Sequence, residues 1–242
     1  MNGLARRLLA EGVGTALLVC VVVGSGIAAE QLSPDDVGLQ LLENSLATVF
    51  GLATLILLLG PVSGAHFNPA VSLADWFLGR RDGSGLSLPE VGAYAAAQCV
   101  GGIAGAIVAN LMFGVETTLS ATDRASGPHF LAEVVATAGL VALIFSLVRT
   151  GRAAVAAPAV GAYIGAAYWF TSSTSFANPA VTIGRVFSDT FAGIAPGSVP
   201  AFVAAQALGA VVGVVLVLAL YPTTSGEPDR EPSLIDEPLP GR

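Results

Sequence analysis

Residues 63–71 form the motif Ser63-Gly64-Ala65-His66-Phe67-Asn68-Pro69-Ala70-Val71, and residues 176–181 form a partial copy, Phe176-Ala177-Asn178-Pro179-Ala180-Val181. In both copies Asn stands where a helix N-cap is expected, and Pro stands at the first helical position. An Asn side chain can accept hydrogen bonds from the free N–H groups of a helix start, and Pro has no N–H to leave unpaired. Each copy therefore predicts a short helix of about ten residues, roughly 15 Å long, which is half of a bilayer core.

The composition is that of a membrane protein. Of 242 residues, 54% are hydrophobic and only 11% are charged, whereas soluble domains carry about a quarter charged residues. The net charge is −7 and no basic cluster is present, so we expect no nucleic-acid partner. Cys20 and Cys99 lie in apolar runs without the spacing of metal ligands. We interpret them as buried thiols and predict no metal and no cofactor.

Six segments are long and apolar enough to cross a bilayer. They run over about residues 8–29, 39–59, 91–113, 130–148, 153–170 and 200–220. The two Asn-Pro-Ala segments lie between the second and third spans and between the fifth and sixth. Because they are too short to cross alone, we predict re-entrant half-helices, whose ends must be covered by protein or a water path. The first span imitates a signal peptide, but we expect it to be retained because its Glu11 has a counterpart in the second half.

The two halves of the chain resemble each other. Gln98 in the third span has a counterpart in Gln206 of the sixth, and Gly105 is matched in the same way by Gly213. These Gly residues give each span a face of small residues for close helix contact. One three-span unit is therefore used twice, and an odd number of spans forces the second copy to insert upside down. We predict a first repeat over 1–113, a second, inverted repeat over 114–221, and an acidic, Pro-rich, disordered cytoplasmic tail over 222–242.

The basic residues are distributed unevenly over the connections. Alternate connections and the tail contain Arg6, Arg7, Arg80, Arg81, Arg149, Arg152, Arg230 and Arg242. The other connections contain only Arg124 and Arg185. By the positive-inside rule we predict a protein of the plasma (bacterial inner) membrane with both termini and the first Asn-Pro-Ala loop in the cytoplasm.

Together with Glu11 and Glu133, the two motifs resemble those of the major intrinsic proteins, the aquaporins and aquaglyceroporins, over about residues 5–221. This resemblance implies an all-α membrane protein with six transmembrane helices plus two re-entrant half-helices in an inverted three-span repeat. It also implies a homotetramer in the lipid bilayer with one pore per subunit. The pore motifs would be Asn68-Pro69-Ala70 and Asn178-Pro179-Ala180.

The physical role of such motifs follows from their geometry. Two half-helices that meet N-terminus to N-terminus aim about half a positive charge each at the middle of the membrane. Asn68 and Asn178 would add N–H donors at the same point. A passing oxygen can accept from both, while a cation meets a positive barrier and a water held in this way cannot relay a proton.

The resemblance also implies an outer selectivity filter made by four positions. Carried over without gaps, they are Thr48, Ala166, Ser175 and Val181. The last is nearly always Arg in the family and is Val here, so we expect a wide, uncharged and less discriminating mouth. Two alternatives stay open. Phe50 could replace Thr48 in a shifted alignment, and Arg185, four residues after Val181, could reach the mouth, although a role at the helix end or toward headgroups is favoured.

Three further groups have two readings each. Glu11 and Glu133 are either proton or ion sites or structural acids that brace the re-entrant loops, and both their symmetry and the resemblance favour the second. His66 is either a titrating gate or a polar, pore-lining wall residue, and we favour the wall. His129 has no chemical partners in the sequence.

We therefore predict a passive channel for water and small uncharged solutes such as glycerol, urea and neutral metalloid hydroxides, for example arsenous acid. A water-selective aquaporin and a proton-coupled secondary transporter are the alternatives, because inverted repeats and broken helices also build transporters. A purely structural or adhesive membrane protein is a further one. No nucleophile–base set is present, so we expect no enzyme.

Overall fold

The computed structural model describes residues 3–80 and 82–222, and helices are the only regular secondary structure in these ranges. The helices are α1 (Gly3–Leu32), α2 (Val37–Ser63), α3 (Pro69–Gly79), α4 (Leu88–Phe113), α5 (Gly127–Arg149), α6 (Ala156–Phe170), α7 (Pro179–Gly184) and α8 (Val199–Leu220). Short 3-10 turns are η1 (Ala153–Val155), η2 (Arg185–Phe187) and η3 (Pro196–Ser198). Except for Pro222, the predicted tail lies outside the described residues.

The six predicted spans are confirmed, and six helical segments are long and apolar enough to cross a membrane. Most of them extend a few residues beyond the apolar runs, because local caps rather than hydrophobicity determine where they begin and end. The Asp36 side chain accepts from Leu39 N at the start of α2, and Ser87 and Glu90 form a capping box at the start of α4. Gly114 ends α4 in the left-handed conformation (φ 66°).

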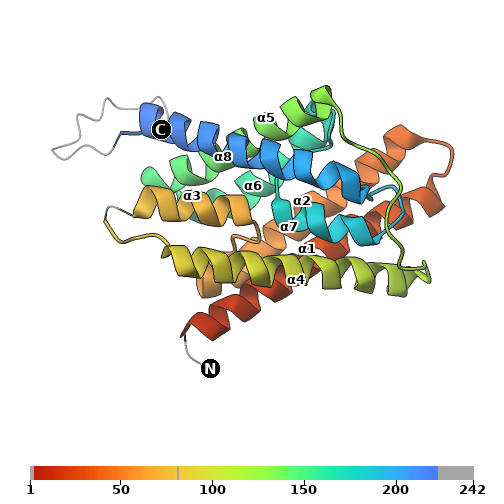
Figure 1. The fold of residues 1–242 in the computed structure, drawn as a ribbon, viewed down its shortest axis with the longest axis horizontal. Helices are drawn as coiled ribbons and strands as arrows, with labels where there is room; N and C mark the ends of the chain where they lie inside the picture. Colours follow the sequence, from red (N-terminus) through yellow and green to blue (C-terminus); the bar gives the residue numbers. More distant parts are fainter. Residues whose placement is uncertain (1–2, 81, 223–242) are drawn as a thin grey trace, which may run out of the picture.

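The two half-helices enter the bundle from opposite ends, as an inverted repeat requires (Figure 1). α3 lies in the half nearer the start of α1, and α7 lies in the opposite half. α1 begins and α8 ends at the same end of the molecule, where an Arg149 Nη1 donates to Tyr221 O. The second half-helix is shorter than predicted, because α7 has only 6 residues and continues as the 3-10 turn η2.

Close helix pairs hold each repeat together. A Cβ at Gly105 of α4 would lie 2.0 Å from Ala16 O of α1, and one at Gly213 of α8 would lie 2.7 Å from Ala138 O of α5. Only Gly permits these approaches. The faces of small residues predicted in the third and sixth spans therefore pack α1 against α4 and α5 against α8.

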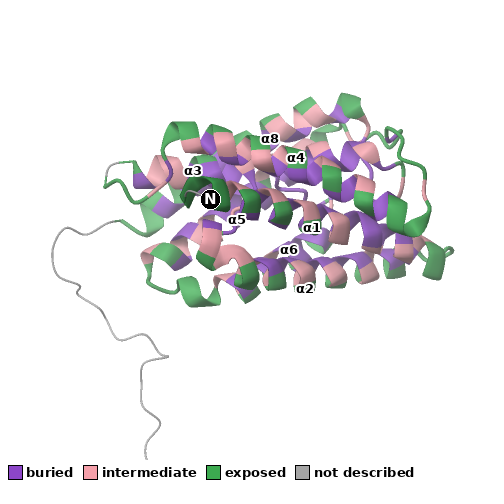
Figure 2. Ribbon diagram, turned by 90° about the horizontal axis from the view of Figure 1, so that it is seen from below, coloured by how far each residue is buried: buried purple, intermediate pink, exposed green. Residues whose placement is uncertain are grey.

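The outer surface of the bundle is apolar. Large side chains such as Leu57 of α2, Val100 of α4 and Val211 of α8 are at least 60% exposed, and exposed positions line the outward sides of the helices (Figure 2). Lipid tails are as apolar as these side chains, so a bilayer covers them without cost.

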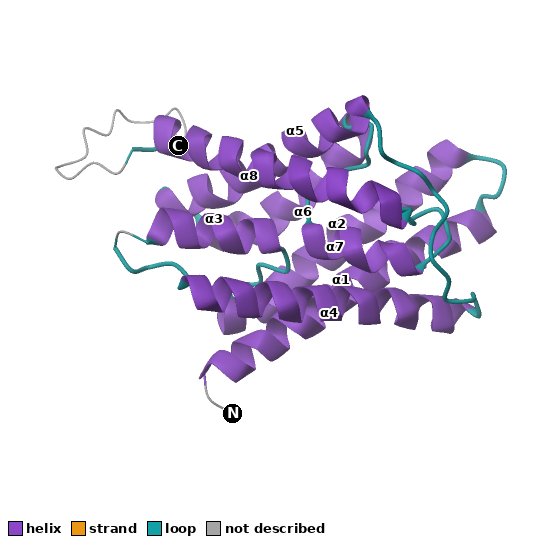
Figure 3. Ribbon diagram, in the orientation of Figure 1, coloured by secondary structure: helices purple, strands orange, loops and turns teal. Residues whose placement is uncertain are grey.

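The connections without helix lie mainly at the two ends, except for the re-entrant segments that reach the interior before α3 and α7 (Figure 3). The segment between α4 and α5 runs along one end and is tied to the loop after α7, because Ser120 N donates to Val186 O at 2.8 Å and Ala195 N donates to Thr122 O at 2.7 Å. The loop after α7 includes Ala192, whose backbone oxygen binds a side chain of the site described below.

Candidate functional site

The starts of α3 and α7 are built alike. Asn68 Oδ1 accepts from Ala70 N at 2.9 Å, and Asn178 Oδ1 accepts from Ala180 N at 2.9 Å and from Val181 N at 3.2 Å. Pro follows at the first helical position of each. Both helices thus begin where the sequence predicts, for the capping reason given above.

The two Asn side chains cross-link the half-helix starts. Asn68 Nδ2 donates to Ala177 O at 2.7 Å, and Asn178 Nδ2 donates to Phe67 O at 2.7 Å. This reciprocal pair brings the N-termini of α3 and α7 together. Each amide nitrogen has a second N–H, and both Asn side chains contribute to the wall of the cavity described below.

The segments before the half-helices adopt an unusual backbone conformation. Ala65 (φ 50°) and Phe67 (φ 50°) are in the left-handed region, and so are Ser175 (φ 52°) and Ala177 (φ 48°) in the second copy. Such residues cost about 1–2 kcal/mol each, so they need compensation.

That compensation comes from two buried carboxylates. Glu11 accepts from Ser63 Oγ (2.6 Å), His66 N (3.0 Å), Phe67 N (2.7 Å) and Gln98 Nε2 (2.7 Å). Glu133 has the matching donors in the second repeat: Ser173 Oγ (2.7 Å), Phe176 N (2.9 Å), Ala177 N (2.8 Å) and Gln206 Nε2 (2.6 Å). Both acids are fully buried, and neither belongs to the cavity wall.

A cavity of about 520 Å³ runs along the bundle and passes both Asn residues. Its wall includes Ala153 near the end where α1 begins and Thr48 and Arg185 toward the other end. One group of lining residues is aliphatic and comes from α2, α5 and α6: Leu52, Ile56, Leu140, Ile144, Val160 and Ile164. Polar groups come from the re-entrant segments, so the cavity has an amphipathic wall.

Three of the four filter residues inferred from the sequence line this cavity, namely Thr48, Ser175 and Val181. The prediction for Ala166 is wrong, because Ala166 lies on the exposed side of α6. Ile164 and Tyr168 of the same helix line the cavity instead. Residues four apart share a helix face, whereas the residue midway between them points to the opposite side.

The alternative filter residue Phe50 is also excluded. Its side chain is 68% exposed on the outside of α2, two residues and therefore more than half a turn from Thr48. Thr48 is buried, donates to Asn44 O at 2.9 Å, and has its Oγ1 3.1 Å from the Tyr168 hydroxyl.

Arg185 is the main departure from the sequence prediction. Of the two roles that the sequence leaves open for it, the favoured one at the helix end or toward headgroups is wrong, since Arg185 is 97% buried (3% exposed) and lines the cavity. Its Nε donates to Ala192 O, and its guanidinium carbon lies 3.5 Å from the centre of the Phe176 ring. The expectation of an uncharged mouth is therefore wrong. The only signal in the sequence for Arg185 at the cavity is its position four residues after Val181. For Tyr168 the alignment without gaps gives no signal, because it selects Ala166 on the same helix instead.

The two His residues occupy different surroundings. His66 lines the cavity, with Nδ1 3.1 Å from Ser72 Oγ and its ring 5.6 Å from that of Tyr94. His129 lies outside the cavity, with Nδ1 2.8 Å from Arg124 O. Cys20 and Cys99 are half-buried and also lie outside it.

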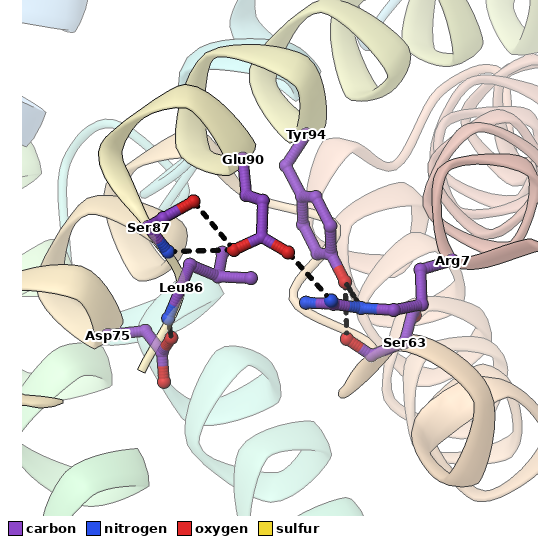
Figure 4. A network of polar contacts seen from close by, with 7 residues as sticks. All are labelled: Arg7, Ser63, Asp75, Leu86, Ser87, Glu90 and Tyr94. Atoms are coloured by element: carbon purple, nitrogen blue, oxygen red, sulfur yellow. Dashed lines mark hydrogen bonds and ion pairs between the residues drawn. The ribbon is translucent and has the colours of Figure 1, made fainter. Parts of the chain in front are cut away.

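A polar network closes the packing at the end where α1 begins (Figure 4). Arg7 of α1 pairs with Glu90 of α4 at 2.9 Å and donates to the Tyr94 hydroxyl at 2.8 Å. That hydroxyl donates to Ser63 O at 2.9 Å. The network therefore ties α1 and α4 to the residue at which α2 ends and the first re-entrant segment begins.

Comparisons with known proteins agree with this geometry. The family model described as Major intrinsic protein matches residues 2–175. The chain is 50% identical to Aquaglyceroporin AqpS of Rhizobium meliloti over 215 residues, which cover 88% of this chain and 89% of the relative. It is 31% identical to the Glycerol uptake facilitator protein of Pseudomonas aeruginosa, with 95% of each chain covered. The X-ray structure of the aquaglyceroporin from Plasmodium falciparum has the same fold, with a TM-score of 0.62, 21% identity, and coverage of 88% of this chain and 95% of that one.

Proposed function

Because the chain belongs to the major intrinsic protein family, whose members are channels and not enzymes, we propose that it conducts water and small uncharged solutes passively across the plasma (bacterial inner) membrane. The observation that carries this proposal is the cavity that passes beside the joined starts of α3 and α7 and is lined by Asn68 and Asn178. Asn68 and Asn178 are the pore donors of the proposal, within the motifs Asn68-Pro69-Ala70 and Asn178-Pro179-Ala180.

The proposed solutes are water and glycerol, followed by urea and neutral metalloid hydroxides such as arsenous acid. An aliphatic wall opposite polar groups suits a solute that has a carbon backbone on one side and hydroxyls on the other. Thr48, Ser175 and Val181 have small or medium side chains, which leaves room for more than one water molecule. Two relatives that are named for aquaglyceroporin or glycerol uptake activity support the same solute class.

The half-helices explain why ions would be excluded. Their N-termini meet at Asn68 and Asn178, so both positive helix ends point into the cavity at one place. A cation that has shed its water there gains no compensating acceptor, whereas the oxygen of water or an alcohol accepts from the Asn amides.

The arrangement of the bundle supports an orientation. Arg6, Arg7, Arg80, Arg149 and Arg152 belong to the segments at the end where α1 begins, so we place both termini in the cytoplasm. We assign 1–113 and 114–221 to the two repeats, and we propose that the apolar outer faces pack against lipid and against three further copies in a homotetramer.

Two alternatives make different predictions. A water-selective channel is favoured by Tyr168 and Arg185, because two large polar side chains line the cavity near Val181. A proton-coupled transporter needs an acid or His in the solute path. Glu11 and Glu133 do not fill that role in our proposal, because both lie outside the cavity and are saturated with donors. His66 and Asp75 do line the cavity, so the transporter alternative rests on these two residues, and the flux experiment below separates it from a passive pore.

Flux through liposomes that contain the purified full chain tests the proposal. We expect stopped-flow light scattering to show rapid water and glycerol equilibration, above that of protein-free liposomes. The glycerol rate constant should stay unchanged as glycerol concentration rises and when a pH gradient is imposed, because a passive pore has no turnover step. Saturation, or acceleration by the gradient, would establish the transporter instead.

A further inference from the structure

The mouth of the cavity has a fixed positive charge, although the residue at position 181 is the uncharged Val181. Val181 occupies the position where the family pattern has Arg, while Arg185 follows one helical turn later at the junction of α7 and η2. Both residues line the same cavity. The side chain of Arg185 therefore reaches the same space from a different backbone position.

The guanidinium of Arg185 is held at its Nε edge and at one face. Ala192 O accepts from Nε, and the Phe176 ring lies against the guanidinium plane at 3.5 Å. Within residues 3–80 and 82–222, its two terminal nitrogens make no hydrogen bond, and the only ion pair is Arg7–Glu90. The guanidinium is thus anchored without a direct ion pair, and the N–H groups of its terminal nitrogens are available to the cavity.

The hydroxyl of Ser175 is a further polar group at the mouth, and it has no hydrogen-bond partner. Ser175 Oγ is buried, lines the cavity, and has no hydrogen bond in the structure. A buried hydroxyl without a partner costs free energy, and a passing solute or water would supply that partner. Arg185 can donate to a solute oxygen while Ser175 accepts from a solute hydroxyl, so the pair matches an uncharged polyol or water and opposes a cation.

We propose that Arg185 is the selectivity cation of this channel, displaced by one turn from position 181. This inference rests on the proposed channel function. Arg185 excludes protons and other cations from the mouth, and its free N–H groups replace part of the hydration shell of an entering neutral solute. Its planar donor set, fixed against Phe176, makes it more than a point charge.

Arg124 provides a matched control. Its guanidinium carbon also lies near the Phe176 ring, at 5.4 Å, but Nε donates to Gly193 O and Nη2 donates to Phe191 O. Arg124 is outside the cavity wall. Removing this charge therefore tests for a general electrostatic or structural effect near the same ring.

The test uses proteoliposomes of the full chain with a trapped pH-sensitive dye, and records proton entry, water flux and glycerol flux. Arg185→Gln should keep water flux but raise proton entry at least about tenfold, as loss of one close, partly screened charge allows. Glycerol flux should fall severalfold relative to water flux. Arg185→Lys should remain proton-tight, and Arg124→Gln should match the wild type.

A double variant separates charge from folding. Val181→Arg combined with Arg185→Gln returns the cation to the family position and should restore proton exclusion. If Arg185→Gln does not fold, proton leakage through a water-conducting Arg185→Lys variant overturns the proposal, and proton tightness supports it. Two outcomes overturn only this inference. One is an Arg185→Gln variant that stays proton-tight with an unchanged ratio of glycerol flux to water flux. The other is an Arg124→Gln variant that leaks protons as much as Arg185→Gln does. A wild type that conducts neither water nor glycerol overturns the proposed function and this inference with it.

Discussion

Glu11 and Glu133 show how single residues permit the re-entrant backbone. Each carboxylate accepts two backbone N–H groups and two side-chain donors, all from the segment before a half-helix or from a neighbouring span. A carboxylate has about four acceptor positions, so each is fully used. The structural reading of these acids, which the sequence favoured through their symmetry, is the one that this hydrogen bonding supports.

A Glu11→Gln substitution tests that reading. The amide nitrogen of Gln cannot accept, so two of the four donors lose their acceptor and a new N–H₂ group faces them. We expect a loss of about 3 kcal/mol of stability, measured as a lower Tm of the purified protein in detergent. The exposed Glu116 provides the control, since Glu116→Gln should change stability by no more than about 0.5 kcal/mol. A Glu11→Gln protein with wild-type stability would contradict the account.

The filter shows the limit of sequence reasoning at this scale. Thr48, Ser175 and Val181 could be placed on the cavity by carrying the filter positions of the family over without gaps, as the resemblance implies. Ala166 could not, since a shift of two residues in a helix exchanges its inner and outer faces. Arg185 could not be placed either, because its position depends on Phe176 and on Ala192, which comes from a loop without a repeating pattern.

At the scale of helices, close packing depends on individual glycines. α1 and α4 approach so closely that Ala16 O of α1 occupies the space that a Cβ at position 105 of α4 would need. The same helix contains Gly92, which is exposed and has open space around it. The two positions thus separate the effect of helix contact from the effect of helix propensity.

We predict that Gly105→Ala destabilises the protein by about 2 kcal/mol or more, because the helices must separate to admit the methyl group. Gly92→Ala should be neutral or stabilising by up to about 1 kcal/mol, since Ala has the higher helix propensity. Thermal unfolding in detergent and the yield of folded protein measure both. Equal behaviour of the two variants would show that the α1–α4 contact is not as tight as described.

The helices themselves could be predicted with few errors. Long apolar runs identify the spans, and the Asn-Pro pairs identify where α3 and α7 begin, because capping is a local property. The end of α7 could not be predicted in this way. It becomes a 3-10 turn at Arg185, within the segment that packs against the loop holding Ala192.

For the whole molecule, the duplication is the dominant feature. Two units of three spans and one half-helix bring the two Asn residues together beside a common cavity. The Glu and Gln residues form equivalent bonds, Glu11 with Gln98 in one repeat and Glu133 with Gln206 in the other. This symmetry could be predicted from the repeat. The selectivity could not, because the mouth is lined by Thr48, Tyr168 and Arg185, which are not among the Asn, Glu and Gln residues matched between the two halves.

The central claim is that the cavity conducts solutes larger than water through a mouth that Val181 keeps open beside Arg185. Osmotic light scattering on liposomes, comparing wild type with Val181→Arg, tests it most directly. We predict that the wild type passes both water and glycerol, and that Val181→Arg lowers glycerol flux at least about tenfold while water flux persists, because a second guanidinium fills the remaining space. A wild type that passes only water, or a variant that passes glycerol unchanged, would contradict the account.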